Sequence, residues 1–593
     1  MMTKICLILF FLIVSASSAQ QTFIQNVTAR DITELNGYWK IIIDPYENGF
    51  FNYRYQESPN GYFKNESPKT KSDLIEYDFD SSDSLLVPGD WNTQKESLFF
   101  YEGTVWYKKS FNFSPKKDKR IFINIGAANY NSVVYFNGDK VGSHTGGFTP
   151  FAFEVTDKID EDENFAVIKV DNKRVRQGVP TLNTDWWNYG GITRDVYLVE
   201  TPPTFIRDYF IQLKPYSTNI IEGWIQLDGV DLNKSVTLSI PELNINEIIT
   251  PANNGLAKFS LKSNPVLWEP NNPYLYDISI RSLSDTVKDM IAFRSIKTNG
   301  TDILLNNKPI FLKGISIHEE SPITHGRASS IEDALKTLEW VKELGCNFIR
   351  LAHYPHNENI IRQAEKMGIL VWSEIPVYWT ILWDNIETYR NAEHQLMEMI
   401  SRDKNRANII IWSVANETPR GEERLAFLTS LIIKAKELDP TRLVSAATEL
   451  TYEGNVVTLD DPLCDYLDVI GANEYIGWYS RTAEEAQLLE WKSNFNKPLI
   501  ISEFGGGALY GLHGDKETRW TEEFQENIYI NQIAMLKNIP FLKGTTPWIL
   551  FDFRSPRRPL PKIQDFYNRK GLISTEGNKK KAFYILKNFY EEN

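Results

Sequence analysis

The chain has 593 residues and a formal net charge of −13, and 42% of its residues are hydrophobic. This length is too great for one ordinary core, so we expect two to four domains. The negative charge argues against nucleic acid as a partner, because no basic face large enough to neutralise several phosphates is evident.

Residues 1–19 have the pattern of a secretory signal peptide. Lys4 gives the positive start, CLILFFLIV is the apolar segment, and Ser17, Ser18 and Ala19 form a small-residue cleavage site. The apolar run is too short for a comfortable membrane span. We therefore expect an exported protein, periplasmic or else secreted, with no membrane span after signal cleavage.

Residues 20–200 contain short alternating runs such as RIFINIG and FAVIKVDN, without a sustained helical period. Asn137-Gly138 lies between two such runs and predicts a β-hairpin. The pattern predicts an all-β sandwich, specifically a jelly roll. Residues 201–297 carry further strand-like runs, whose number and spacing predict an immunoglobulin-like β-sandwich.

From residue 298 to residue 593, strand-like runs alternate with helical stretches, which predicts a (β/α)₈ TIM barrel. In that fold the active site lies at the carboxyl ends of the strands. Glu417 ends the run IIIWSVANE, and Glu503 follows PLIIS. A carboxylate at the end of a buried strand is costly unless something uses it. Two of them in one domain suggest glycoside hydrolysis by paired carboxylates.

The runs DKNRANIIIWSVANE and NFIRLAHYP, taken with the domain order, resemble the two signatures of glycoside hydrolase family 2. The second match is looser, because Leu351 stands where a small residue is more usual. The resemblance implies that Glu417 is the general acid/base and that Glu503 is the nucleophile of a retaining double displacement. It also implies that Asn416 binds the sugar 2-hydroxyl.

The resemblance extends to further residues. It implies that Tyr475 orients the nucleophile, that Trp548 forms the floor of the sugar site, and that Asp185 reaches the sugar hydroxyls from the first domain. It also places strand-end residues around the site, although these could instead form a purely structural salt-bridge network: His318, Arg350, His353 and Glu374.

The segment DFYNRKGLIS bears on the sugar. Asn568-x-Lys570-Gly571 resembles the motif with which β-glucuronidases bind the uronate carboxylate, and Tyr479 lies where a tyrosine assists that contact. An ordinary turn with exposed basic residues is the alternative. Gln564 departs from the pattern, where a basic residue is more usual. We expect one nearby arginine to replace that contact, from the set Arg554, Arg557 and Arg558.

The sequence therefore predicts an exo-acting β-glucuronidase. The alternatives are a family 2 β-galacturonidase or β-galactosidase, or a carbohydrate-binding protein that has lost catalysis. A short segment, residues 375–391, favours oligosaccharide ends of a uronate-containing plant or algal polysaccharide, with ulvan as one candidate.

Two carboxylates need no cofactor, and the 7 His show no metal-ligand spacing, so we expect neither cofactor nor metal. The resemblance also implies that the chain can form a homo-oligomer.

Overall fold

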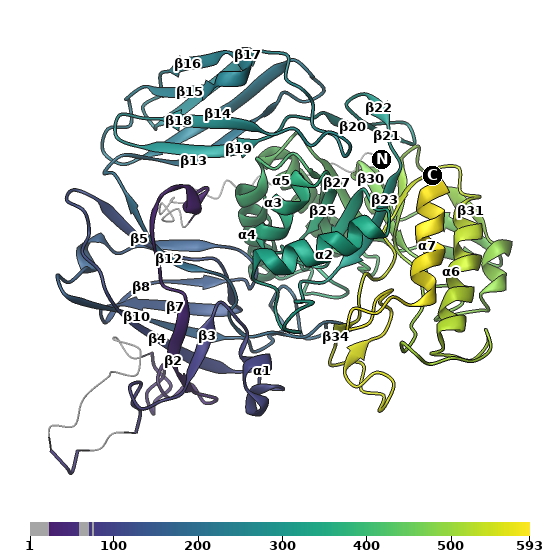
Figure 1. Ribbon diagram of the computed structural model, residues 1–593, viewed down its shortest axis with the longest axis horizontal. Helices are drawn as coiled ribbons and strands as arrows, with labels where there is room; N and C mark the ends of the chain where they lie inside the picture. Colours follow the sequence, from purple (N-terminus) through teal and green to yellow (C-terminus); the bar gives the residue numbers. More distant parts are fainter. Residues whose placement is uncertain (1–22, 58–69, 74–75, 593) are drawn as a thin grey trace, which may run out of the picture.

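The computed structural model describes residues 23–57, 70–73 and 76–592. Within these residues, two β-sandwiches lie on one side of a barrel of strands and helices (Figure 1). The predicted signal peptide lies outside the described residues. No helix in the described part of the chain is long and apolar enough to cross a membrane.

The first sandwich is a jelly roll in which a four-stranded sheet, β1-β12-β5-β9, faces a six-stranded sheet, β3-β2-β4-β10-β7-β8. Its strands are β1 (Asp31–Glu34), β2 (Gly37–Ile43), β3 (Ser84–Val87), β4 (Thr104–Asn112), β5 (Arg120–Ile125), β7 (Asn131–Phe136), β8 (Asp139–Thr145), β9 (Phe151–Glu154), β10 (Glu163–Asp171) and β12 (Val196–Thr201). The alternation of β5 is typical: Ile121 and Ile123 enter the core between the sheets, whereas Phe122 packs on the opposite face.

The predicted hairpin joins β7 to β8. Asn137 and Gly138 have φ values of 47° and 92°, and Phe136 pairs with Asp139 across the turn. Asparagine and glycine tolerate positive φ better than other residues, which is why this dipeptide forms a tight hairpin. The structure confirms this prediction.

The second sandwich is immunoglobulin-like, with sheets β13-β14-β17 and β16-β15-β18-β19. Its strands are β13 (Phe205–Leu213), β14 (Ile220–Asp228), β15 (Val236–Ile240), β16 (Ile245–Ile249), β17 (Leu256–Lys262), β18 (Tyr276–Arg281) and β19 (Thr286–Ile291). Alternate residues of β14, among them Ile221 and Ile225, enter the core between these sheets. A small sheet of β20 (Ile296–Asn299), β21 (Asp302–Leu305) and β22 (Lys308–Pro309) then leads into the barrel.

The barrel is closed by parallel strands in the order β23-β24-β25-β26-β27-β30-β32-β33. They are β23 (Leu312–Ile317), β24 (Phe348–Leu351), β25 (Leu370–Glu374), β26 (Ile409–Asn416), β27 (Leu443–Thr448), β30 (Val469–Asn473), β32 (Leu499–Glu503) and β33 (Leu542–Thr545). This confirms the predicted barrel. Strands such as β26 are buried along their whole length, because helices cover the outer face and side chains fill the inside.

The barrel helices are α2 (Ile331–Glu343), α3 (Glu358–Lys366), α4 (Ile386–Asp403), α5 (Glu422–Leu438), α6 (Glu522–Leu536) and α7 (Lys581–Glu592). Helix α2 shows why such segments begin where they do. Ser330 accepts from the backbone of Asp333, whose carboxylate accepts in return from the backbone of Ser330. Its apolar side, with Leu338 and Val341, is buried in the barrel core.

Candidate active site

The carboxyl ends of the barrel strands bring the predicted polar side chains together, because parallel strands of a closed barrel end at one rim. The strand register shifts twice at this rim, between Ser413 and Asn416 in β26 and between Ala472 and Asn473 in β30. Such bulges re-aim the side chains that follow them. The polar residues of these strand ends are His318, Arg350, Glu374, Asn416, Glu417, Asn473 and Glu503.

The carboxylate of Glu503 is buried, with only 5% of the residue exposed, and two donors fix it. Arg350 Nη1 donates to Oε1 over 2.9 Å, and the Tyr475 hydroxyl donates to Oε2 over 2.6 Å. One donor is cationic and the other neutral, and each takes a different oxygen. The carboxylate is therefore held in a single orientation at the rim.

Arg350 is fully buried and connects most of the acidic groups of the rim. It donates to both oxygens of Glu374, over 3.0 and 3.1 Å, and to Asn416 Oδ1 over 2.7 Å. His353 Nδ1 lies 2.7 Å from Glu374 Oε1. Burial alone would raise the pKa of Glu374, but Arg350 and His353 lower it to about 2. Glu374 is thus a permanent anion that holds Arg350 in place.

Glu417 receives two hydrogen bonds that the sequence did not predict. Trp379 Nε1 donates to Oε2 and Asn473 Nδ2 donates to Oε1, each over 2.8 Å. Glu417 and Trp379 have φ values of 50° and 55°, a region that side chains avoid unless their surroundings impose it. Asn473 could have been found as the polar end of a barrel strand. Trp379 lies in the aromatic-rich segment after β25.

In the side-chain amide of Asn416, the oxygen accepts hydrogen bonds, whereas the nitrogen has no partner among the described residues. Its Oδ1 accepts from Arg350 over 2.7 Å and from Asn473 over 3.3 Å. Its Nδ2 is buried and has no hydrogen-bond partner among the described residues. A buried amide without a partner is costly, so this atom is a donor available to a ligand hydroxyl.

The two glutamates influence each other electrostatically. Burial raises the pKa of Glu503, and the negative charge of Glu417 raises it further, against the opposing effects of Arg350, His353 and Tyr475. The ionisation of Glu503 thus depends on the charges of its neighbours. One acid and one anion side by side are what glycoside hydrolysis by a carboxylate pair requires.

Aromatic rings surround the carboxylates. Trp548 stacks on His353 with ring centroids 4.8 Å apart and meets His318 edge-on at 5.1 Å. Burial lowers the pKa of His318 well below its usual range, so its imidazole is neutral. Trp186, from the first sandwich, lies 4.9 Å from Tyr378 and 5.6 Å from His353. Trp186 was not predicted as a site residue, although it directly follows Asp185.

Lys570 is buried beside the Glu503 side of the site. Its Nζ donates to the Tyr479 hydroxyl over 2.7 Å and lies 4.4 Å from the Tyr475 ring centroid. In the described part of the chain it forms no ion pair within 4.0 Å. Burial alone would raise the pKa of Tyr479, but Lys570 and Arg558 lower it. Asn568 is also buried, and its Oδ1 accepts from the backbone of Lys570 over 3.2 Å.

Asp185 reaches this region from the first sandwich, but protein donors already occupy it. Its Oδ1 accepts from Ser555 Oγ over 2.6 Å and from Arg558 Nε over 3.1 Å. Its Oδ2 accepts from Asn568 over 3.2 Å and also from Arg558 Nη2. The structure thus shows Asp185 positioning Arg558 and Asn568. Its predicted contact with sugar hydroxyls stays a prediction.

The three candidate arginines lie in different places. Arg558 forms an ion pair with Asp185 and lies close enough to Tyr479 to lower its pKa. Arg557 covers the ring of Trp379 at 4.8 Å, so it lies beside the Glu417 end of the site. Arg554 instead packs between the rings of Phe99 and Tyr567. Arg558 is therefore the arginine placed to assist Lys570.

One group of side chains in the described residues could hold a metal ion, and it lies outside this rim: His144, His394 and Glu398. The complete group has no recognisable spacing along the chain, because His144 belongs to the first sandwich and the other two residues to the barrel. The carboxylates of Glu417 and Glu503 have protein donors on both oxygens.

The chain belongs to glycosyl hydrolase family 2. The family description "TIM barrel domain" matches residues 296–592, and the description "sugar binding domain" matches residues 32–202. The protein is accordingly a glycoside hydrolase, with its acidic pair on the barrel and one wall of the site supplied by the sugar-binding domain.

Several relatives resemble the whole chain. A β-glucuronidase of Paenibacillus borealis is 26% identical, over 96% of this chain and 98% of its own length. The structure of a β-D-glucuronidase from Dictyoglomus thermophilum is 27% identical with a TM-score of 0.77, covering 95% of this chain and 98% of the other. A β-galacturonidase from Eisenbergiella tayi, bound to galacturonate, has a TM-score of 0.79 over 95% of this chain and 98% of its own. Its identity of 23% shows a common fold and no more.

Proposed function

We propose that this protein is an exo-acting, retaining β-glucuronidase that hydrolyses terminal β-D-glucuronosyl residues. The observation that carries the proposal is Lys570. Its ammonium belongs to a residue that is only 4% exposed, and among the described residues its one hydrogen bond goes to a tyrosine hydroxyl. A buried cation without an anionic partner is costly, and a sugar carboxylate would supply that partner.

The surroundings of Lys570 favour a uronate over a neutral sugar. Tyr475 links the two halves of the site, because its hydroxyl binds Glu503 while its ring lies 4.4 Å from Lys570 Nζ. A sugar whose anomeric carbon meets Glu503 can thus direct its carboxylate towards Lys570, with Asn568 nearby. A neutral hexose would leave the ammonium unpaired. The β-glucuronidases among the relatives support the same substrate class.

The proposed chemistry assigns a role to each group at the rim. Ionised Glu503 attacks the anomeric carbon while Glu417 gives its proton to the leaving oxygen, which forms a glycosyl-enzyme intermediate. Glu417 then takes a proton from water, which attacks the same carbon and releases the sugar with its configuration retained. The free Nδ2 of Asn416 would bind the 2-hydroxyl, where hydrogen bonding strengthens towards the transition state.

The natural setting of the enzyme is the second part of the proposal. The connection between β25 and α4 is short, only residues 375–385, so no long segment from this position covers the substrate. We propose chain ends of a uronate-containing plant or algal polysaccharide, such as ulvan, as substrates. The signal-like residues 1–19 support export, most simply to the periplasm. A homo-oligomer is compatible with this role.

The direct test is a panel of p-nitrophenyl β-glycosides, namely the glucuronide, galacturonide, galactoside, glucoside and mannoside, with Glu503→Gln as the blank. We expect the highest kcat/KM on the glucuronide. Preference for the galacturonide would keep the uronate site and overturn the sugar assignment, since these sugars differ at the C4 hydroxyl. Preference for a neutral sugar would overturn both. Nuclear magnetic resonance of the first-formed anomer tests retention independently.

A further inference from the structure

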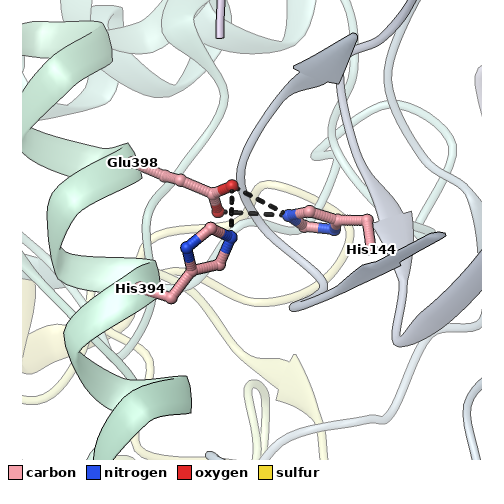
Figure 2. A group of neighbouring side chains, drawn as sticks. All are labelled: His144, His394 and Glu398. Atoms are coloured by element: carbon pink, nitrogen blue, oxygen red, sulfur yellow. Dashed lines mark hydrogen bonds and ion pairs between the residues drawn. The ribbon is translucent and has the colours of Figure 1, made fainter. Parts of the chain in front are cut away.

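Two histidines and one glutamate meet where the first sandwich contacts the barrel. His144 lies in β8, whereas His394 and Glu398 lie on α4, the barrel helix on that side (Figure 1). Figure 2 shows both imidazoles pointing at the carboxylate of Glu398 from opposite elements. This group lies outside the carboxylate pair and the Lys570 region, and hydrolysis makes no use of it.

The ligand atoms are close together. His144 Nε2 lies 3.0 and 3.1 Å from the two oxygens of Glu398, and His394 Nε2 lies 2.8 Å from Oε1. One ligand atom from each residue falls within 4.8 Å of the others. Bonds of about 2.0–2.2 Å to a shared ion place tetrahedral ligand atoms roughly 3.3–3.5 Å apart. Only small side-chain movements separate the observed arrangement from that geometry.

The helix and the sandwich supply the preorganisation that a metal site needs. His394 and Glu398 are four residues apart, so they project from the same face of α4. The hydroxyl of buried Thr149 donates to Glu398 Oε2 over 2.6 Å and so orients the carboxylate from behind. The His144 ring is stacked on Phe151 with centroids 4.2 Å apart. These contacts fix two of the three ligands before any ion arrives.

His144 has no other polar role in the described part of the chain. The residue is 6% exposed, its Nε2 faces Glu398, and its Nδ1 has no hydrogen-bond partner there. His394, in contrast, has a side chain that is 48% exposed. The group is thus buried on the sandwich side and open on the helix side, which gives an ion an entry path and leaves one position for water.

We propose that His144, His394 and Glu398 form a binding site for a divalent transition-metal ion, of which zinc fits best, that joins the first sandwich to the barrel. Two imidazoles and one carboxylate are a ligand set that zinc accepts with a water in the fourth position. Calcium and magnesium favour oxygen ligands, so they fit poorly. The ion would link two domains that both contribute to the active site.

The test is zinc binding by isothermal titration calorimetry, on full-length protein without a histidine tag and freed of metal by a chelator. We expect one zinc ion per chain. His394→Ala should weaken binding at least about 100-fold, because even loss of a supporting contact costs about 10- to 100-fold. Glu398→Gln should have a similar effect. His394 is exposed, so its variant should fold, and unchanged glycoside hydrolysis without zinc checks this.

The matched control is His513→Ala. His513 is also an exposed histidine, and its Nδ1 lies 3.0 Å from Glu523 Oε1, but it does not belong to a three-ligand group. Its loss should leave zinc affinity unchanged. Zinc should also raise the unfolding temperature of the wild type but not of His394→Ala. Absence of zinc binding by the wild type, or equal affinity in the wild type and His394→Ala, would overturn the proposal.

Discussion

The two ends of the barrel treat buried charge in opposite ways. At the amino ends of the strands, Arg294 is 2% exposed and every nitrogen of its guanidinium donates to a backbone carbonyl. The acceptors lie 2.7–3.0 Å away and belong to Ala407, Ile409 and Thr441. Each guanidinium nitrogen of Arg294 already has an acceptor, so Arg294 stabilises the fold and leaves no donor for a ligand.

At the carboxyl ends, polar groups of similar burial lack some of the partners that they could have. Lys570 has a tyrosine hydroxyl as its hydrogen-bond partner, and in the described part of the chain Asn416 Nδ2 and His318 Nε2 have none. Unsatisfied buried polar atoms are rare because they cost stability. The difference between Arg294 and Lys570 teaches that the partners of a buried cation, more than its burial, distinguish a structural residue from a candidate ligand-binding one.

The largest expected effect on activity comes from the carboxylates. Glu503→Gln should lower kcat at least about 10⁴-fold on every substrate, since the nucleophile is gone. Glu417→Gln should lower kcat/KM, which reports formation of the glycosyl-enzyme, as strongly on poor leaving groups but much less on a dinitrophenyl glycoside, which leaves without a proton. Steady-state rates on the two substrate types measure this. Equal losses on both for Glu417→Gln would contradict its role as acid.

Lys570→Met should lower kcat/KM for a glucuronide about 100-fold or more, because truncating one partner of a buried charge pair costs about 2–5 kcal/mol. The methionine keeps most of the apolar stem in place. Any slow hydrolysis of neutral glycosides should be unchanged or faster. A uniform loss on charged and neutral sugars would instead make Lys570 a structural residue like Arg294.

Tyr475→Phe should lower kcat about 10- to 100-fold, because a hydrogen bond to a charged group is worth about 1.5–3 kcal/mol. The pH profile gives the sharper test. Tyr475 lowers the pKa of Glu503, so its removal raises that pKa further. The nucleophile must be ionised, and the acidic limb of kcat/KM should therefore move to higher pH. A fall in kcat without this movement would contradict the assignment.

Arg558→Ala should lower uronide hydrolysis about tenfold, because it leaves the buried carboxylate of Asp185 with fewer donors and Tyr479 with one cation fewer. Arg557→Ala should have a smaller effect and Arg554→Ala almost none, since neither contacts Lys570. Rates on the glucuronide measure all three. Unchanged hydrolysis in all three variants would contradict the prediction that an arginine replaces the contact of the basic residue that is missing at position 564, where this chain has Gln564.

The smallest expected effect on catalysis belongs to Arg294→Met. It leaves buried carbonyls without donors, each costing about 1–3 kcal/mol, so the free energy of unfolding should fall by several kcal/mol. The kcat per folded molecule should not change. Chemical denaturation measures the first quantity and active-site titration the second. A large loss of kcat in folded protein would remove the contrast between the two ends of the barrel.

The sequence allowed prediction of the features that are encoded locally. Glu417 and Glu503 could be found because each ends a buried strand whose apolar run is visible in the chain. The Asn137-Gly138 hairpin was equally local. Trp379 was not predicted, because nothing in its own segment indicates that its indole reaches a carboxylate 38 positions away. Such contacts depend on the conformation of the loops at the carboxyl ends of the strands, which the hydrophobic periodicity of the sequence does not indicate.

The same limit applies between domains. The spacing of His394 and Glu398 is visible on one helix, but His144 lies some 250 residues earlier and reaches them only through domain docking. The engagement of Asp185 with Arg558 spans 373 positions. The family resemblance implied a role for Asp185, but it did not predict that Ser555, Arg558 and Asn568 donate hydrogen bonds to it.

The segment around Asp185 and Trp186 has a consequence for engineering. Beyond these two side chains, the backbone of Trp187 donates to Arg554, and the Tyr189 hydroxyl donates to Glu320. The sugar-binding domain and the barrel are thus joined by several hydrogen bonds along this segment, so a change in one domain affects the other. A chimaera that exchanges either domain alone would lose the contacts of Asp185 and Trp186 with the barrel, so we expect specificity to be transferred only when both domains are exchanged together.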